Sequence, residues 1–193
     1  AEGDPFALVM TGNKQLESLY LNAEKDDGYI RDQSVFGDNI SIEDTMNVLV
    51  RYANGAQMSY SLNAYSPWEG FRVGFTGTKG RIEIEVIEKV YINAGGDASS
   101  EGVVKGKKIT VYPMFADAYS VEIKEGIGSH GGGDKVMLEY LFGLQEKDIY
   151  NRSASYIDGV MSILTGISAN KSIAKQQMIN VLSLVDLPGF RNL

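Results

Sequence analysis

The chain has one histidine, His130, which stands directly before three consecutive glycines and Asp134. Glycine lets the backbone approach a bound molecule closely, and the free amides at a helix N-terminus favour anions and hydroxyl oxygens. Histidine titrates near neutral pH, and aspartate accepts hydrogen bonds from sugar hydroxyls. Two interpretations follow. Either His130 and Asp134 contact a polar substrate, or His130 is a surface loop residue and Asp134 only caps the helix that follows.

Aromatic and acidic residues form a second set of candidates. Tyr65 and Trp68 flank Pro67 at a strand end, where an aromatic ring can either stack on a sugar or pack inside the protein. The acidic pairs 26–27 and 43–44 have no second histidine and no metal-ligand spacing beside them. We therefore interpret these pairs as solvated charge and predict no metal site.

The motifs of several other chemistries are absent from the sequence. No G-x-G-x-x-G, G-x-S-x-G or H-E-x-x-H motif is present. Segment 74–80 is rich in glycine but lacks the spacing of a phosphate-binding loop, so we interpret it as a turn. The residues themselves therefore predict no catalytic residue and no cofactor-binding residue in this chain.

Composition narrows the class of protein further. The net charge is −7, and no run of lysine and arginine is present to neutralise a phosphate backbone, which argues against nucleic acid as a partner. No apolar stretch approaches the roughly 20 residues that span a bilayer, so we expect no membrane partner. The absence of cysteine excludes disulfides and favours a reducing compartment, hence a cytoplasmic protein.

The middle of the chain carries the alternation of apolar and polar residues that is typical of half-buried strands. Segments 45–52 and 56–64 alternate on both sides of Asn54-Gly55, which predicts a hairpin with a type I′ turn. Segments 71–76 and 81–86 alternate around the turn at 77–80. Further strands are predicted over 89–93, 107–115 and 119–124, for a total of about seven.

The last third of the sequence is predicted to be helical. One helix is expected over 134–145, and a second begins at Ser155, where Asp158 three residues later completes a capping box. The second helix places these apolar residues on one face: Ile157, Val160, Met161, Leu164 and Ile167. Strands followed by helices indicate an α+β fold, with a largely antiparallel open sheet and helices packed on one face.

The opposite face of this sheet is polar and free to face water or a partner subunit. It carries Asn47, Arg51, Gln57, Ser59, Ser61 and Asn63. We divide the chain into an irregular lead-in over residues 1–43, with a short helix around 14–22, and an open-sheet domain over 44–193. The acidic start without a methionine leads us to expect a piece of a longer protein.

Several segments, taken in order, resemble the C-terminal domain of the glucose–fructose oxidoreductase and inositol dehydrogenase (Gfo/Idh/MocA) family. They are residues 43–45, 50–56, 75–83, 130–134 and 164–173, and the likeness runs from about residue 20 to the end. Each segment alone is weakly specific, whereas the ordered set is much more so.

The resemblance implies a full-length enzyme whose N-terminal Rossmann domain, absent from this chain, binds NAD or NADP. The present domain would then supply the wall of a sugar pocket and a sheet for homo-oligomer formation. The Glu-Lys pairs at 24–25, 88–89 and 146–147 lack the proline of the family's catalytic Glu-Lys-Pro motif, and the family's Asp-x-x-x-His pair is absent. By itself the chain is therefore predicted to be inactive and to bind no nicotinamide cofactor.

With the family in view, Tyr29 and Arg31 join His130 and Asp134 as candidate sugar contacts. Two functions remain open at this point. The first is a substrate-binding and oligomerisation domain of an NAD(P)-dependent oxidoreductase acting on a sugar, as a dehydrogenase or in redox-assisted glycoside cleavage. The alternative is a free-standing, non-catalytic carbohydrate-binding module that uses the sheet face or the edge at Trp68.

Overall fold

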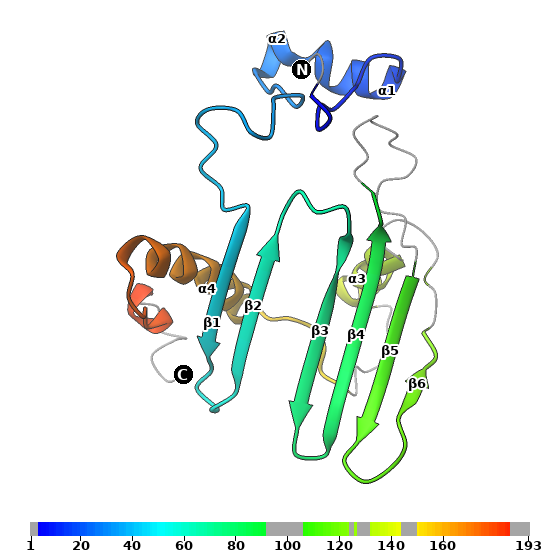
Figure 1. The fold of residues 1–193 in the computed structure, drawn as a ribbon, viewed down its shortest axis with the longest axis vertical. Coiled ribbons are helices and arrows are strands. Elements are labelled where there is room, and N and C mark those ends of the chain that lie inside the picture. Colours follow the sequence, from blue (N-terminus) through cyan, green and yellow to red (C-terminus); the bar gives the residue numbers. More distant parts are fainter. Residues whose placement is uncertain (1–3, 92–105, 124–125, 127–131, 144–149, 186–193) are drawn as a thin grey trace. The chain divides into compact units, whose positions relative to one another are not determined.

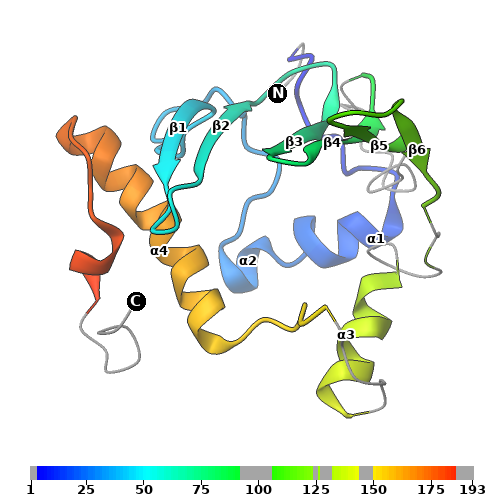
Figure 2. The same ribbon diagram turned by 90° about the horizontal axis from the view of Figure 1, so that it is seen from below.

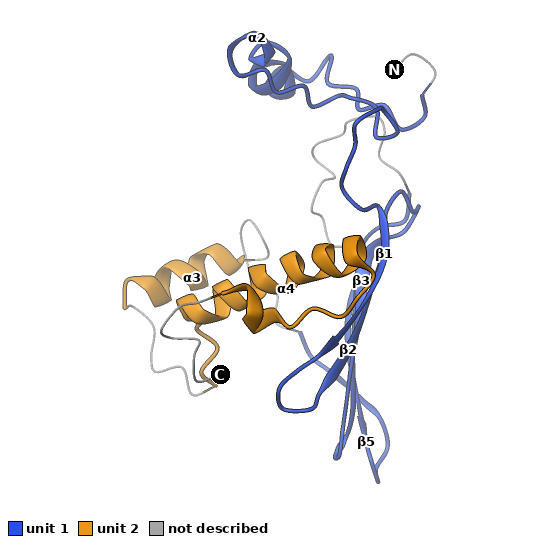
Figure 3. Ribbon diagram, turned by 90° about the vertical axis from the view of Figure 1, so that its left-hand side faces the viewer, with its two compact units in different colours: residues 1–125 blue, residues 126–193 orange. Residues whose placement is uncertain are grey.

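The computed structural model describes residues 4–91, 106–123, 126, 132–143 and 150–185. The chain divides into two compact units, Ala1–Glu125 and Gly126–Leu193 (Figure 3). Within the described residues, unit 1 holds the lead-in and all six strands, and unit 2 holds the two longest helices. The division that we predicted between residues 43 and 44 falls inside unit 1 and stays a prediction.

The lead-in contains a short helical stretch (Figure 2). Helix α1, Lys14–Leu16, begins at Asn13, whose side chain accepts hydrogen bonds from the backbone N–H groups of Gln15 and Leu16. The π-helical turn η1, Glu17–Leu21, continues it, and helix α2 follows at Glu24–Asp27. The helix predicted around 14–22 is thus present, and it ends in a π-helical turn.

Strands β1, Thr45–Arg51, and β2, Gln57–Asn63, form an antiparallel hairpin (Figure 1). Met46 lies opposite Leu62 and Val48 opposite Tyr60, so one face is apolar, as the alternation predicts. The predicted type I′ turn is wrong, because only Gly55 of the Asn54-Gly55 pair has a positive φ, 89°. Arg51 and Gln57 are the last paired residues, which leaves a loop longer than two residues.

A second sheet has four antiparallel strands in sequence order (Figure 1). They are β3 Glu69–Gly77, β4 Gly80–Lys89, β5 Gly106–Pro113 and β6 Tyr119–Val121. The strand predicted to start at residue 89 is instead the end of β4, and Val90 and Tyr91 lie in bends. The antiparallel, open α+β architecture is confirmed, with the described strands divided between two sheets.

The cross-strand register separates this second sheet into an apolar and a polar face. The apolar pairs are Phe71–Val86, Val73–Ile84, Phe75–Ile82, Ile82–Val111 and Ile84–Ile109. The residues between them pair as Arg72–Glu85, Gly74–Glu83, Thr76–Arg81, Glu83–Thr110 and Glu85–Lys108. In one row of the polar face, Arg72, Glu85 and Lys108 therefore alternate in charge across three strands.

Unit 2 contains α3, Gly133–Leu141, α4, Tyr156–Lys175, and the 3₁₀ helix η4, Val181–Leu184. The capping box predicted at Ser155 and Asp158 is confirmed at the start of α4. The predicted packing of these helices on a sheet concerns the relation between the two units and stays a prediction. Among the described residues, no helix is both long enough and apolar enough to cross a membrane.

Candidate functional site

The segment that carries His130 and Asp134 is described from Gly132 onward. His130 lies outside the described residues, so its role as a sugar contact stays a prediction. Asp134 lies in the first turn of α3, where a carboxylate interacts favourably with the helix dipole. The cap position itself belongs to Gly132, with φ 81° and no side-chain capping bond, so Asp134 is not the N-cap.

Tyr29 and Arg31 come together around a third residue, Tyr20 of η1. The guanidinium carbon of Arg31 lies 4.4 Å from the centre of the Tyr20 ring. The rings of Tyr20 and Tyr29 are 6.1 Å apart, and Tyr29 is 56% exposed. We call these three residues the lead-in cluster. Tyr20 was not predicted from the sequence, because its contact with Tyr29 and Arg31 depends on the chain reversal at Gly28.

Local backbone geometry positions Tyr29 in this cluster. Helix α2 ends at Gly28, whose φ of 71° is in the left-handed region that glycine adopts without strain. The backbone N–H of Tyr29 then donates to Oδ1 of Asp27 at 2.8 Å, which fixes the turn. The sequence Asp-Gly-Tyr thus reverses the chain and carries Tyr29 and Arg31 back beside the helical stretch.

Tyr65 packs inside the protein, in agreement with one of the two interpretations of its ring. Its ring centre lies 4.9 Å from that of Phe36 and 6.1 Å from that of Phe6. Its hydroxyl donates to the carbonyl oxygen of Val35 at 3.2 Å. These contacts join the lead-in to the β2–β3 connection, so Tyr65 positions the lead-in.

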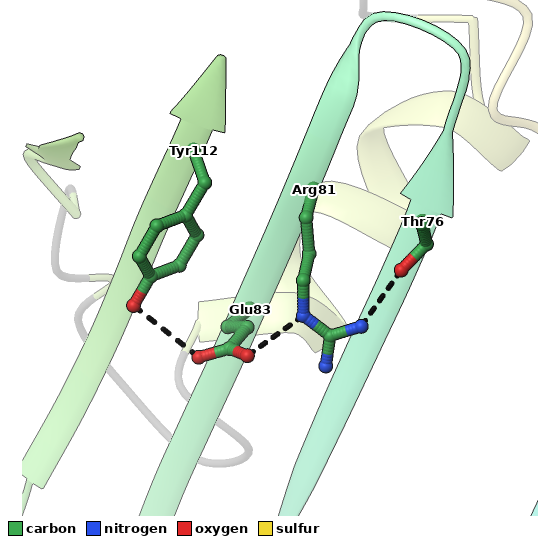
Figure 4. Close-up of polar contacts among 4 residues, drawn as sticks. All are labelled: Thr76, Arg81, Glu83 and Tyr112. Atoms are coloured by element: carbon green, nitrogen blue, oxygen red, sulfur yellow. Dashed lines mark hydrogen bonds and ion pairs between the residues drawn. The ribbon is translucent and has the colours of Figure 1, made fainter. Parts of the chain in front are cut away.

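A polar network crosses the polar face of the second sheet (Figure 4). Nε of Arg81 donates to Oε1 of Glu83 at 2.7 Å, and its Nη1 donates to Oγ1 of Thr76, also at 2.7 Å. The Tyr112 hydroxyl donates to Oε2 of Glu83 at 3.4 Å. The Arg81 hydrogen bond is the main reason that the pKa of Glu83 lies below its ordinary value. This network depends on the strand register and was not predicted from the sequence.

Comparison with known proteins decides the family. Residues 6–181 match the family model described as "Oxidoreductase family, C-terminal alpha/beta domain", of Gfo/Idh/MocA type. The chain belongs to this family. One relative, named "Putative oxidoreductase YteT", comes from Bacillus subtilis (strain 168) and is 32% identical over 160 residues. That alignment covers 82% of the chain and 36% of the relative, so the chain spans about a third of the relative's length. No solved structure matches.

The glycine-rich segment 74–80 does not have the arrangement that holds a dinucleotide cofactor. A dinucleotide pyrophosphate is held where a glycine-rich turn leads from a strand into a helix. Here the glycine-rich segment 74–80 leads from β3 directly into β4. Segment 74–80 is therefore a turn between two paired strands, as its spacing predicts. Within the described stretches, no group of three or more histidine, aspartate or glutamate side chains is placed to hold a metal ion.

Proposed function

We propose that this Gfo/Idh/MocA domain binds a sugar or sugar derivative for an NAD(P)-dependent oxidoreductase. The cofactor and the catalytic residues would belong to a Rossmann domain outside this chain. The lead-in cluster is the observation that carries the proposal. It places an exposed tyrosine ring beside an arginine that is stacked on a second tyrosine.

The chemistry of the lead-in cluster suits a neutral polyhydroxylated ring. Aromatic faces pack against the C–H groups of a sugar, and guanidinium N–H groups donate to hydroxyl oxygens. Helix α2 directly before Tyr29 contains three carboxylates and one lysine. A negatively charged ligand would therefore be repelled at short range, whereas a neutral sugar would not. In unit 2, His130 and Asp134 remain proposed sugar contacts.

The hydride transfer itself would be the chemistry of the nicotinamide ring. Arg31 and Tyr29 would hold the sugar and limit its orientations, a contribution that lowers the entropic cost of reaching the transition state. The chain alone is therefore proposed to be inactive, and to act as a homo-oligomer together with its Rossmann domain.

Calorimetric titration of the chain with methyl β-D-glucopyranoside, methyl β-D-galactopyranoside and NAD tests this function. We expect weak, saturable binding of a glycoside and no binding of NAD. Arg31→Met and Tyr29→Ala should each weaken glycoside binding by roughly 3- to 10-fold, the effect of losing one positioned hydrogen bond or stacking contact.

Lys25→Met is the matched control, because it removes a cation from α2 and leaves the contacts among Tyr20, Tyr29 and Arg31 in place. Equal weakening by Lys25→Met and Arg31→Met would show that only net charge matters, and would contradict the proposed contact. Micromolar binding of NAD to this chain would contradict the assignment of the cofactor to another domain.

The alternative, a free-standing carbohydrate-binding module, is favoured by one observation. Trp68 stacks with Arg72 at the beginning of β3, with the guanidinium carbon 4.7 Å from the ring centre. The two functions differ in their genetic context. A reading frame that continues upstream into a strand, G-x-G-x-x-G and a helix would support the oxidoreductase, and its absence would support the module.

A further inference from the structure

The ring of Trp68 lies at the beginning of β3, next to Gly70, which has no side chain. Gly70 lies next to a shift in the β3–β4 register and has φ 152°, a value that glycine adopts freely. A Cβ at this position would lie 3.1 Å from Cη2 of Trp68 and would collide with the carbonyl oxygen of Val86. Gly70 therefore creates the space in which the edge of the indole lies.

Arg72 and Glu85 extend this aromatic surface with a donor and an acceptor. The Arg72 guanidinium stacks on the Trp68 ring, and its Nε donates to Oε2 of Glu85 at 2.6 Å. The two charged side chains remain 67% and 36% exposed. Within the described part of the chain, neither the Nη atoms of Arg72 nor Oε1 of Glu85 has another hydrogen-bond partner.

The Arg81–Glu83 pair on the same sheet shows what is unusual about Arg72–Glu85. Arg81 also binds its glutamate through Nε, at 2.7 Å. There, however, Thr76 accepts from the remaining guanidinium edge and Tyr112 donates to the second carboxylate oxygen. The Arg81 pair is thus engaged on both sides within the protein, whereas the Arg72 pair presents its outer donors and acceptor beside an indole.

We propose that Trp68, Arg72 and Glu85 form a binding site for a neutral saccharide, separate from the lead-in cluster. Each of two neighbouring sugar hydroxyls can both donate and accept, so a vicinal diol matches the Arg72 donors and the Glu85 acceptor. Trp68 is half-buried, and the apolar face of the pyranose ring packs against the part of the indole that Arg72 does not cover. Glu85 lies between Arg72 and Lys108 in the cross-strand register and neutralises part of their charge, and the chain carries a net charge of −7, so an anionic sugar has no advantage over a neutral one.

The chain contains a single tryptophan, so the fluorescence of Trp68 reports directly on this site. Titration of the chain with methyl β-D-glucopyranoside or methyl β-D-galactopyranoside should change the emission saturably, with a dissociation constant on the order of 1 mM. Sodium glucuronate should bind no more tightly than the glycosides. Arg72→Met and Glu85→Gln should each weaken the glycoside response by roughly 3- to 10-fold, with an unchanged circular dichroism spectrum.

Arg81→Met is the matched control and should leave the response unchanged, because its pair lacks an indole. Arg31→Met should also leave it unchanged, since this site does not depend on the lead-in cluster or on the proposed oxidoreductase function. Three results would overturn the proposal: no saturable change with either glycoside, tighter binding of glucuronate, or equal weakening by Arg81→Met and Arg72→Met. Glu85→Gln keeps the test decisive if Arg72→Met does not fold.

Discussion

At the scale of single residues, the ionisation of Asp158 makes the stability of the start of α4 depend on pH. Its Oδ2 accepts hydrogen bonds from the backbone N–H and the hydroxyl of Ser155, both at 2.7 Å. The backbone hydrogen bond is the main cause that lowers the pKa of Asp158 below 3.8. Because the folded pKa lies below the unfolded value, the ionised carboxylate stabilises the fold above that value. This stabilisation is lost as the pH falls through the folded pKa.

Asp158→Asn should therefore lower the melting temperature at neutral pH by about 2–4 °C, the scale of one lost helix cap in a chain of this size. The difference from the wild type should shrink once the pH is well below 3.8, where the wild-type carboxyl is protonated too. Thermal unfolding followed by circular dichroism at both pH values measures it. Asp117→Asn, an exposed carboxylate between β5 and β6, is the control. A difference that is the same at every pH would contradict this role.

The family resemblance named two of the three residues of the lead-in cluster. Tyr29 and Arg31 were named from a family resemblance, while their meeting at Tyr20 depends on the reversal at Gly28 and on the π-helical turn before it. No alternation or spacing rule contains that information, since π-helical turns have no strong sequence signal. The capping box at Ser155 was predictable because both of its partners lie within one helical turn.

At the scale of elements, substitution of Gly70 measures how closely β3 packs against β4 and Trp68 at this position. Gly70→Ala should destabilise the chain by about 1–3 kcal/mol, because alanine is strained at φ 152° and its Cβ meets the backbone of β4. Gly77→Ala is the matched control on the same strand, where a Cβ meets nothing within 4 Å, and should change stability by no more than about 0.5 kcal/mol. Urea unfolding measures both. Equal effects would show that backbone entropy, and not the space beside Val86, dominates at Gly70.

The alternation of apolar and polar residues predicted where the strands lie and which face of each strand is apolar. The period of two located both hairpins and assigned the faces of β1 and β2 correctly, because each strand has one apolar and one polar face. The alternation did not reveal that β2 and β3 belong to separate sheets. That outcome depends on whether β2 and β3 pair with each other across the connection that contains Pro67, and the alternation within a strand does not specify its partner. The turn at Asn54-Gly55 also differed, because loop length, set by the last pair Arg51–Gln57, decides the turn type.

At the scale of the whole molecule, the polar face of β1 and β2 has a feature that suits a subunit interface. Leu49 lies in the middle of β1, opposite Ser59, on the face that otherwise carries Asn47, Arg51 and Ser61. It is 85% exposed. A large apolar side chain centred in a ring of polar residues is the usual composition of a contact between protein surfaces. This supports the proposal that the chain associates with a second copy through this face.

Leu49→Asp should then convert the associated form to monomer, because a buried, unpaired carboxylate at the centre of a two-fold contact meets its own copy and has no compensating partner. Sedimentation equilibrium over a range of concentrations measures the change, and circular dichroism checks that the fold is retained. Ser59→Thr is the control, since it keeps a hydroxyl on the same face and should leave association intact. A wild-type chain that remains monomeric at high concentration would contradict the proposed interface. A Leu49→Asp variant that associates as well as the wild type would place the interface on another surface.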